Sequence, residues 1–170
     1  LDPLGSLARD GWLAHDSWTR IAELLNSSWS ASVSSRCLRI DDLPYHYAGA
    51  SEAQSLGFVI AAAIESMRAL ETAGVSPTVS AGQLEVLLHL DCEFFLGIAK
   101  VRALRRLWSN VRAHCGIDST LRVHSRTSPR VLSERDPWVN ILRNTTTCFA
   151  GAVAGVQAIS TDSFDCRIGL

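Results

Sequence analysis

Residues 36–51 read RCLRIDDLPYHYAGAS, and this stretch decides the fold of the chain. It opens with a short strand-like run at 36–40 and then passes through a polar turn. Ser51 stands directly before a long apolar segment at about 52–73, where its hydroxyl suits the cap of a helix. Gly74, just past that segment, is typical of a helix end. Strand, loop and helix in this order predict one βα unit.

The same unit recurs along the chain. We predict four strands, at about 36–40, 84–90, 121–126 and 158–161, and four main helices, at about 17–26, 52–73, 93–113 and 136–153. Strand starts about 36 to 48 residues apart leave room for one helical crossover each, which favours a parallel sheet with helices packed outside it. The sequence therefore predicts an α/β domain with about four parallel strands alternating with helices.

Several architectures contain such a sheet. A complete (β/α)₈ barrel needs about 250 residues, so four strands cannot close one. Three alternatives remain: half of such a barrel, an excised piece of one, or a small open doubly wound sheet. No Gly-rich loop of the G-x-G-x-x-G or P-loop type follows any predicted strand, which weakens the nucleotide-binding version of the open sheet.

The composition argues against several classes of protein. Charged residues make up 19% of the 170, and their signs nearly cancel to a formal net charge of −1, so nucleic acid is not an expected partner. The longest apolar run, residues 58–64, is far below the roughly 18 residues of a membrane span. With no secretory signal and five cysteines without a CxxC pair, we expect a soluble cytoplasmic protein with reduced thiols.

A histidine between two tyrosines follows the first predicted strand. Tyr45, His46 and Tyr47 fall in a predicted strand-to-helix loop, and such loops carry functional residues more often than core positions do. One interpretation makes His46 a hydrogen-bonding or acid-base group near a ligand. The other makes it an ordinary loop histidine packed against its aromatic neighbours. The residue pattern leaves both interpretations open.

His124 and Arg126 stand two residues apart in the third predicted strand, so they share one face of the sheet. The strand register decides whether this face is buried or functional. Among the other histidines, we expect His89 in the core and His15 and His114 at the surface. No Ser, His and Asp order and no metal-ligand spacing rises above chance, so the sequence predicts neither a catalytic residue nor a metal site.

Three longer runs carry a family resemblance. They are YHYAGASEAQSLG at residues 45–57, IAKVRALRRLW at 98–108 and DPWVNILR at 136–143. In this order and at natural spacing, they are similar to the barrel of the cobalamin-dependent acyl-CoA mutases. The short form His-x-x-Gly-Ala-Ser at 46–51 is similar to the non-catalytic small subunit of heterodimeric methylmalonyl-CoA mutases.

This resemblance implies a fold, a cofactor and a set of contacts. The chain would be the second half of a TIM-type (β/α)₈ barrel, a single partial domain at residues 1–170 without a cobalamin-binding domain. The complete enzyme would use adenosylcobalamin to rearrange the carbon skeleton between succinyl-CoA and methylmalonyl-CoA through a radical. Tyr45 and His46 would then contact the cofactor, and His124 and Arg126 would contact the acyl-CoA substrate.

Departures from the active members of the family favour a supporting role. The Tyr-His pair of the catalytic subunit falls on Leu43 and Pro44 here, so His46 is a different histidine. Gln83 and Glu85 stand where the resemblance expects a CoA-contacting arginine and a serine, which weakens binding of a polyanion. No Asp-x-His-x-x-Gly motif, which ligates cobalamin in the family, occurs in these residues.

We therefore expect a small-subunit-like chain that pairs with a catalytic large mutase subunit. Alone, it should have no mutase turnover and no tight cobalamin binding. Two alternatives stay open, a stand-alone α/β interaction module and an inactive relic without catalysis. A nucleotide-utilising enzyme is a weaker third alternative, because the sequence has no Gly-rich phosphate loop.

Overall fold

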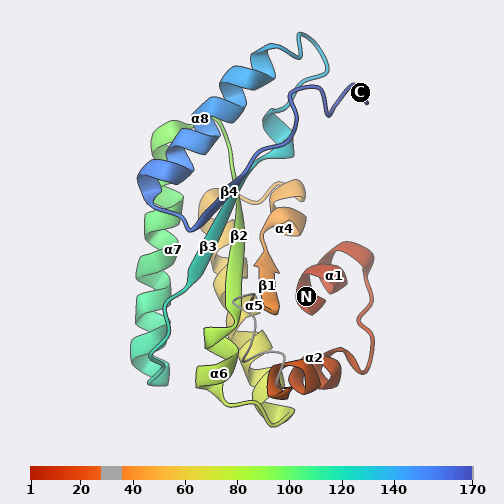
Figure 1. Cartoon of the computed structure of the whole chain (residues 1–170), viewed down its shortest axis with the longest axis vertical. Coiled ribbons are helices and arrows are strands. Elements are labelled where there is room, and N and C mark those ends of the chain that lie inside the picture. The colour runs from red at the N-terminus through yellow and green to blue at the C-terminus, as the bar shows by residue number, and fades with distance from the viewer. Residues whose placement is uncertain (28–35, 170) are drawn as a thin grey trace.

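The computed structural model describes residues 1–27 and 36–169. Within these residues the strands form a four-stranded sheet in the order β1-β2-β3-β4, and all neighbouring strands are parallel. The strands are β1 (Leu38–Asp41), β2 (Leu84–Leu90), β3 (Arg122–Thr127) and β4 (Ala158–Ser160). Figure 1 shows the chain stepping across the sheet with helices between successive strands. The predicted α/β class with four parallel strands is confirmed.

Helices connect the strands and cover the sheet. They are α1 (Pro3–Asp10), α2 (Ser17–Asn26), α4 (Leu43–Tyr47), α5 (Glu52–Thr72), α6 (Pro77–Gly82), α7 (Phe94–Cys115) and α8 (Val139–Ala154), together with the 3₁₀ turn η1 (Pro129–Val131). The long helices α5, α7 and α8 each link two strands, and α7 packs against both of the others. Figure 1 shows α1 beside β1 and α2 at the bottom of the view near α6, both away from α8.

The predicted cap of the second helix is confirmed. The Ser51 hydroxyl accepts a hydrogen bond from the Gln54 backbone N–H at 3.4 Å, and the Gln54 side chain accepts one from the Ser51 N–H at 2.9 Å. This reciprocal pair is a capping box. It fixes the start of α5 at the carboxyl end of β1, which is the edge of the sheet where parallel α/β folds place their ligands.

Two local expectations are wrong. Tyr45, His46 and Tyr47 belong to the short helix α4 rather than to an irregular loop, because Pro44 at its start supplies a helical φ. The helix expected from Asp136 begins at Val139 instead. Asp136 has a φ of +50°, a left-handed value that does not continue into a right-handed helix.

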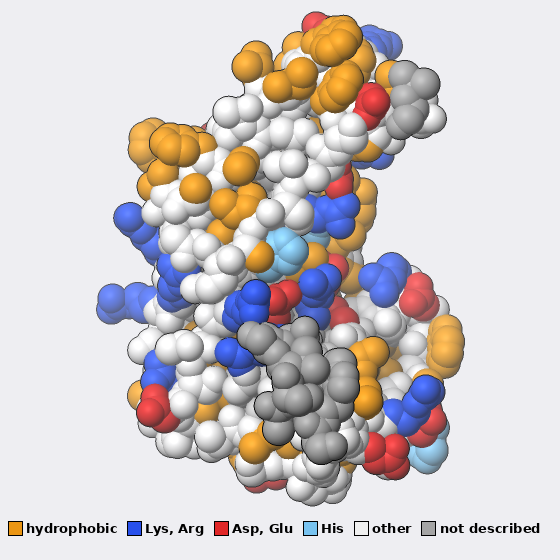
Figure 2. Space-filling model, viewed as in Figure 1, with side chains coloured by type: hydrophobic (Ala, Val, Ile, Leu, Met, Phe, Trp, Pro, Cys, Tyr) orange, Lys and Arg blue, Asp and Glu red, His pale blue; other side chains and the backbone are white. Residues whose placement is uncertain are grey.

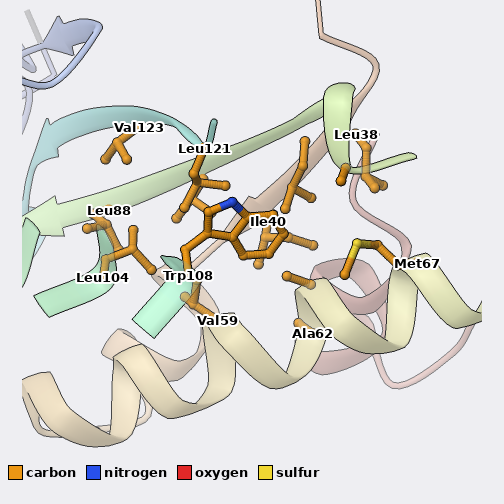
Figure 3. Packing of buried hydrophobic residues seen from close by; sticks show 14 of the residues in the cluster. Leu38, Ile40, Val59, Ala62, Met67, Leu88, Leu104, Trp108, Leu121 and Val123 are labelled. Carbon is orange, nitrogen blue, oxygen red and sulfur yellow. The ribbon is translucent and has the colours of Figure 1, made fainter. Parts of the chain in front are cut away.

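Alternation along the strands gives the sheet two unlike faces. One face is apolar, and Figure 3 shows its side chains packed against α5 and α7: Leu38, Ile40, Leu88 and Val123 from the strands, Val59 and Ala62 from α5, and Leu104 and Trp108 from α7. The other face carries polar residues in matching register: Arg39, Glu85, Arg122, His124, Arg126 and Ser160. If a strand shifted its pairing register by one residue, its apolar side chains would move to this face. Burial of the core therefore also fixes the direction of the polar side chains.

Helix α8 approaches β3 closely at one glycine. A Cβ on Gly151 would lie 2.5 Å from the Ser125 hydroxyl, whereas a Cβ on Gly57, on the exposed side of α5, would meet nothing within 4 Å. Gly151 therefore lets the helix pack onto the strand without a gap.

We predict that Gly151→Ala lowers the free energy of unfolding while Gly57→Ala raises it. Overpacking costs about 1–3 kcal/mol, which exceeds the roughly 0.5–1 kcal/mol that alanine gains over glycine in a helix interior. Urea unfolding of the two variants beside the unchanged chain measures both effects. Equal stabilisation by both substitutions would contradict the close contact of α8 with β3.

Candidate functional site

The carboxyl edge of the sheet is organised by one buried carboxylate. Asp42 follows β1 directly and is fully buried. Its Oδ1 accepts hydrogen bonds from the His89 backbone N–H at 2.9 Å and lies 2.7 Å from the His89 ring Nδ1. Its Oδ2 accepts hydrogen bonds from Lys100 Nζ at 2.8 Å and from the Ser55 hydroxyl at 3.0 Å. Asp42 thus joins the ends of β1 and β2 to α5 and α7.

Lys100 is the matching buried cation. Its ammonium group donates to Asp42, donates to the His89 carbonyl at 2.9 Å and lies 2.6 Å from Glu52 Oε2 at the start of α5. Two of its N–H donors are used in hydrogen bonds, and the carboxylate of Glu52 adds a second negative charge beside it. A buried lysine is costly unless it is paired in this way, so the position of α7 depends on these contacts.

Both members of this pair stay charged. Burial alone would raise the pKa of Asp42, but the hydrogen bond from His89 and the charge of Lys100 together lower it. Burial would likewise lower the pKa of Lys100, but the charges of Asp42 and Glu52 raise it. The edge of the sheet therefore holds an ionised pair.

His46 lies beside this network and is also fully buried. Its Nε2 shares a hydrogen bond with the Ser128 hydroxyl at 2.7 Å and lies 3.4 Å from Asp91 Oδ1. Its Nδ1 is buried without a hydrogen-bond partner among the described residues. The pKa of Asp91 is lowered to about 2, chiefly by the His46 ring and against the opposing effect of burial. His46 faces inward, toward protein groups.

Tyr45 lies on the other side of α4 and packs against α5. Its ring stacks on Phe58 with the centroids 4.7 Å apart, and burial raises the pKa of its hydroxyl. His124 and Arg126, in contrast, lie on the polar face of the sheet. The structure therefore does not bring Tyr45 into the same contacts as His124 and Arg126.

Charged side chains on the polar face of the sheet form ion pairs with one another. Glu85 lies between Arg39 at 3.2 Å and Arg122 at 3.3 Å. His124 Nε2 shares a hydrogen bond with the Ser160 hydroxyl at 2.9 Å, and Arg126 is paired with Asp162. Figure 2 shows Lys or Arg and Asp or Glu side chains gathered across the middle of the visible face. The shared face expected for His124 and Arg126 is confirmed, and both side chains already have protein partners.

The remaining histidines lie where the sequence predicts them. His89 is buried at 1% exposure, and its ring serves Asp42 rather than a ligand. His15 and His114 are exposed. One group of side chains could hold a metal ion, because the ligand atoms of Asp41, Asp42 and His89 all lie within 4.8 Å of one another. Since a cation there would have to break the 2.7 Å contact between His89 Nδ1 and Asp42 Oδ1, we interpret this group as an internal hydrogen-bond network.

Sequence reasoning missed Asp42 and Lys100. A usable signal was present in α7, where Lys100 falls on the same helical stripe as buried Gly97, Leu104 and Trp108. A lone lysine on the apolar stripe of a helix requires a buried acidic partner. The sequence alone does not say which of the 17 acidic residues supplies it.

Comparison with known proteins places the chain in a family. The profile described as methylmalonyl-CoA mutase matches residues 14–170. The chain belongs to the methylmalonyl-CoA mutase family. It is 41% identical over 171 residues to the methylmalonyl-CoA mutase small subunit of Streptomyces virginiae, an alignment that covers 99% of this chain and 28% of that protein.

Other relatives carry similar descriptions. The methylmalonyl-CoA mutase small subunit of Propionibacterium freudenreichii subsp. shermanii is 31% identical over 173 residues, covering 100% of this chain and 27% of that protein. The methylmalonyl-CoA mutase of Escherichia coli K12 is 31% identical over 156 residues, covering 88% of this chain and 22% of that protein. The chain thus spans about a quarter of the length of these relatives. The family resemblance predicted from the sequence is confirmed.

We predict that Lys100→Met destabilises this mutase-family chain by about 3–5 kcal/mol, because the substitution leaves Asp42 as an unpaired buried charge. Arg102→Met is the matched control, since Arg102 is exposed on the same helix and its loss should change stability by about 0.5 kcal/mol or less. Urea unfolding at neutral pH measures both. Similar midpoints for the two variants would show that Lys100 does not hold α7 to the sheet.

We also predict a pH-dependent contribution from Asp91. Its pKa falls from the ordinary 3.8 to about 2 on folding, so ionised Asp91 stabilises the fold above pH 3.8. That contribution is lost as the pH falls toward 2. The stability difference between the unchanged chain and Asp91→Asn should therefore be constant near neutrality and shrink through this window.

Unfolding curves at stepwise lower pH provide the measurement. Asp118→Asn is the control, because Asp118 is fully exposed and its ion pair with Arg112 adds little. A difference for Asp91→Asn that stays constant down to pH 2 would refute the pairing with His46.

Proposed function

We propose that this chain is a supporting, small-subunit-like part of a cobalamin-dependent methylmalonyl-CoA mutase and that it pairs with a catalytic large subunit in the cytoplasm. The observation that carries the proposal is its similarity, over 99% and 100% of its length, to two proteins described as small subunits. None of the described helices is long and apolar enough to cross a membrane. The mutases of this family are isomerases, and the proposed reaction interconverts succinyl-CoA and methylmalonyl-CoA.

We infer that residues 1–170 form the second half of a TIM-type barrel. The strand order β1-β2-β3-β4 is sequential, as barrel closure requires, and has no point where the order reverses. At the outer edge of β1, Leu1 donates to the Cys37 carbonyl at 2.9 Å and accepts from the Arg39 N–H at 2.8 Å. Those two bonds form the pattern of a parallel strand pair, so the sheet geometry already extends past β1.

The far side of the sheet supports the same interpretation. Among the described strands, β4 pairs only with β3. A groove of about 610 Å³ runs beside it along α8, lined in part by exposed Ile141 and Phe149. A further βα unit would add a strand to β4 and lay its helix on this apolar side of α8, as α8 lies on α7.

The polar face of the sheet favours a supporting role over a catalytic one. His124 and Arg126, assigned by resemblance to the substrate, are engaged with Ser160 and Asp162. Glu85 fills the space between Arg39 and Arg122 with a negative charge. An acyl-CoA, which carries several negative charges, would have to break these pairs before it could bind here.

The residues assigned to the cofactor fit it poorly as they lie. Adenosylcobalamin supplies the radical for the rearrangement when it is bound in the complete enzyme. His46 presents no exposed atom to such a ligand, because it is fully buried against Ser128 and Asp91. Tyr45 keeps an exposed part but stacks on Phe58. Contacts of either residue with a corrin stay a prediction.

We predict that the purified chain has no mutase turnover and does not bind adenosylcobalamin at micromolar affinity, yet forms a complex with a methylmalonyl-CoA mutase large subunit. Absorbance titration with adenosylcobalamin and sedimentation velocity with the large subunit measure the two parts. A base-off to His-ligated spectral change would contradict the supporting role. Failure to co-sediment would favour a stand-alone interaction module or an inactive relic.

A further inference from the structure

Glu85 sits in a pocket of positive charge on the polar face of the sheet. Its Oε1 accepts a hydrogen bond from Arg39 at 3.2 Å and lies 3.8 Å from His124 Nδ1, and its Oε2 lies 3.3 Å from Arg122 Nε. Arg39 and Arg122 come from the strands on either side, directly in register with Glu85. Three neighbouring side chains, one on β1 and two on β3, therefore converge on one carboxylate of β2.

The positive groups outnumber the negative ones around this point. Asp162, another acid near the face, is already paired with Arg126. Burial lowers the pKa of His124, the charges of Arg39, Arg126 and Arg122 lower it further, and the charge of Glu85 opposes them. Without Glu85, Arg39, Arg122 and His124 would face one another with no counter-ion among the described residues.

One N–H donor of Arg122 lacks a hydrogen-bond acceptor among the described residues. Its Nε is buried and, although it lies 3.3 Å from Glu85 Oε2, it makes no hydrogen bond with any described residue. Glu85 thus offers two oxygens to three cationic or polar neighbours and leaves one N–H donor unsatisfied. An oxyanion with more acceptor oxygens, such as phosphate, would satisfy this set more completely.

We propose that Arg39, Arg122 and His124 form an anion-binding site in which the carboxylate of Glu85 occupies the place of the ligand. The ligand class is a small oxyanion or an exposed phosphate or carboxylate group. The chain's own side chain excludes such anions from the face, and removal of its charge exposes the site. This inference goes beyond the proposed supporting role and does not depend on it, since it concerns only residues on three strands of this chain.

The test is Glu85→Gln, which keeps the shape of the side chain and removes its charge. Inorganic phosphate is titrated into the full chain by calorimetry at constant ionic strength, with chloride as the exchanged anion. Phosphate should bind the variant about tenfold more tightly, or better, than the unchanged chain. Glu65→Gln on α5 is the control, because Glu65 is exposed and lies 4.0 Å from Arg68, away from the polar face, and this variant should bind phosphate no better than the unchanged chain.

A second variant locates the site. Glu85→Gln combined with Arg122→Gln should lose the gained phosphate binding, whereas Glu85→Gln combined with Arg68→Gln should keep it. Folded Glu85→Gln with unchanged phosphate affinity would overturn the proposal, and so would tight binding that survives loss of Arg122. If Glu85→Gln unfolds in chloride, phosphate should restore its thermal transition, and a variant unfolded in both salts would also overturn the proposal.

Discussion

The buried ion pair between Lys100 and Asp42 is the interaction on which the rest of the structure depends. Its two charges come from α7 and from the end of β1, 58 residues apart in the chain, and the same ammonium group also reaches Glu52 on α5 and the carbonyl of His89 on β2. Charges buried in this way are tolerated only with good geometry and complete hydrogen bonding. The pair therefore fixes the positions of β1, β2, α5 and α7 relative to one another at the carboxyl edge of the sheet.

The same edge is where parallel α/β folds place their chemistry, and here it is used for internal contacts. The ring of His89 contacts Asp42, and the ring of His46 contacts Ser128 and Asp91. On the polar face, Arg126 forms an ion pair with Asp162. A catalytic site keeps reactive groups available to a substrate, whereas these groups are held by the protein itself. This arrangement supports the proposal that the chain has a supporting role rather than a catalytic one.

Much of the fold followed from local sequence. The apolar run at 84–90, the helical periodicity at 17–26 and the Ser51 cap each specify an element through residues close together in the chain, and the structure has these elements at those positions. The turn at Asp136 was missed because a positive φ at a non-glycine residue has no strong signal in the sequence. The short helix α4 was missed because five residues are too few for a periodic pattern.

The candidate site was harder to predict because its contacts join distant residues. Nothing near Asp42 in the sequence indicates Lys100, and nothing near Glu85 indicates Arg39 or Arg122. The resemblance to a family drew attention to Tyr45 and His46 after β1 and to His124 and Arg126 in β3, but it could not say that His46 points inward. That orientation depends on Ser128, which lies 82 residues away and is brought close only by the finished sheet.

Hydrogen exchange at the His89 backbone amide tests the central claim most directly. This amide donates to the buried Asp42 carboxylate at 2.9 Å, so its exchange requires the ion-pair network to open. If the network fixes the edge of the sheet, the His89 amide will exchange as slowly as the amides in the middle of β2, at a rate set by global unfolding. Exchange at the rate of exposed loop amides, in a chain that stays folded, would mean that the edge opens freely and that the ion pair does not hold it.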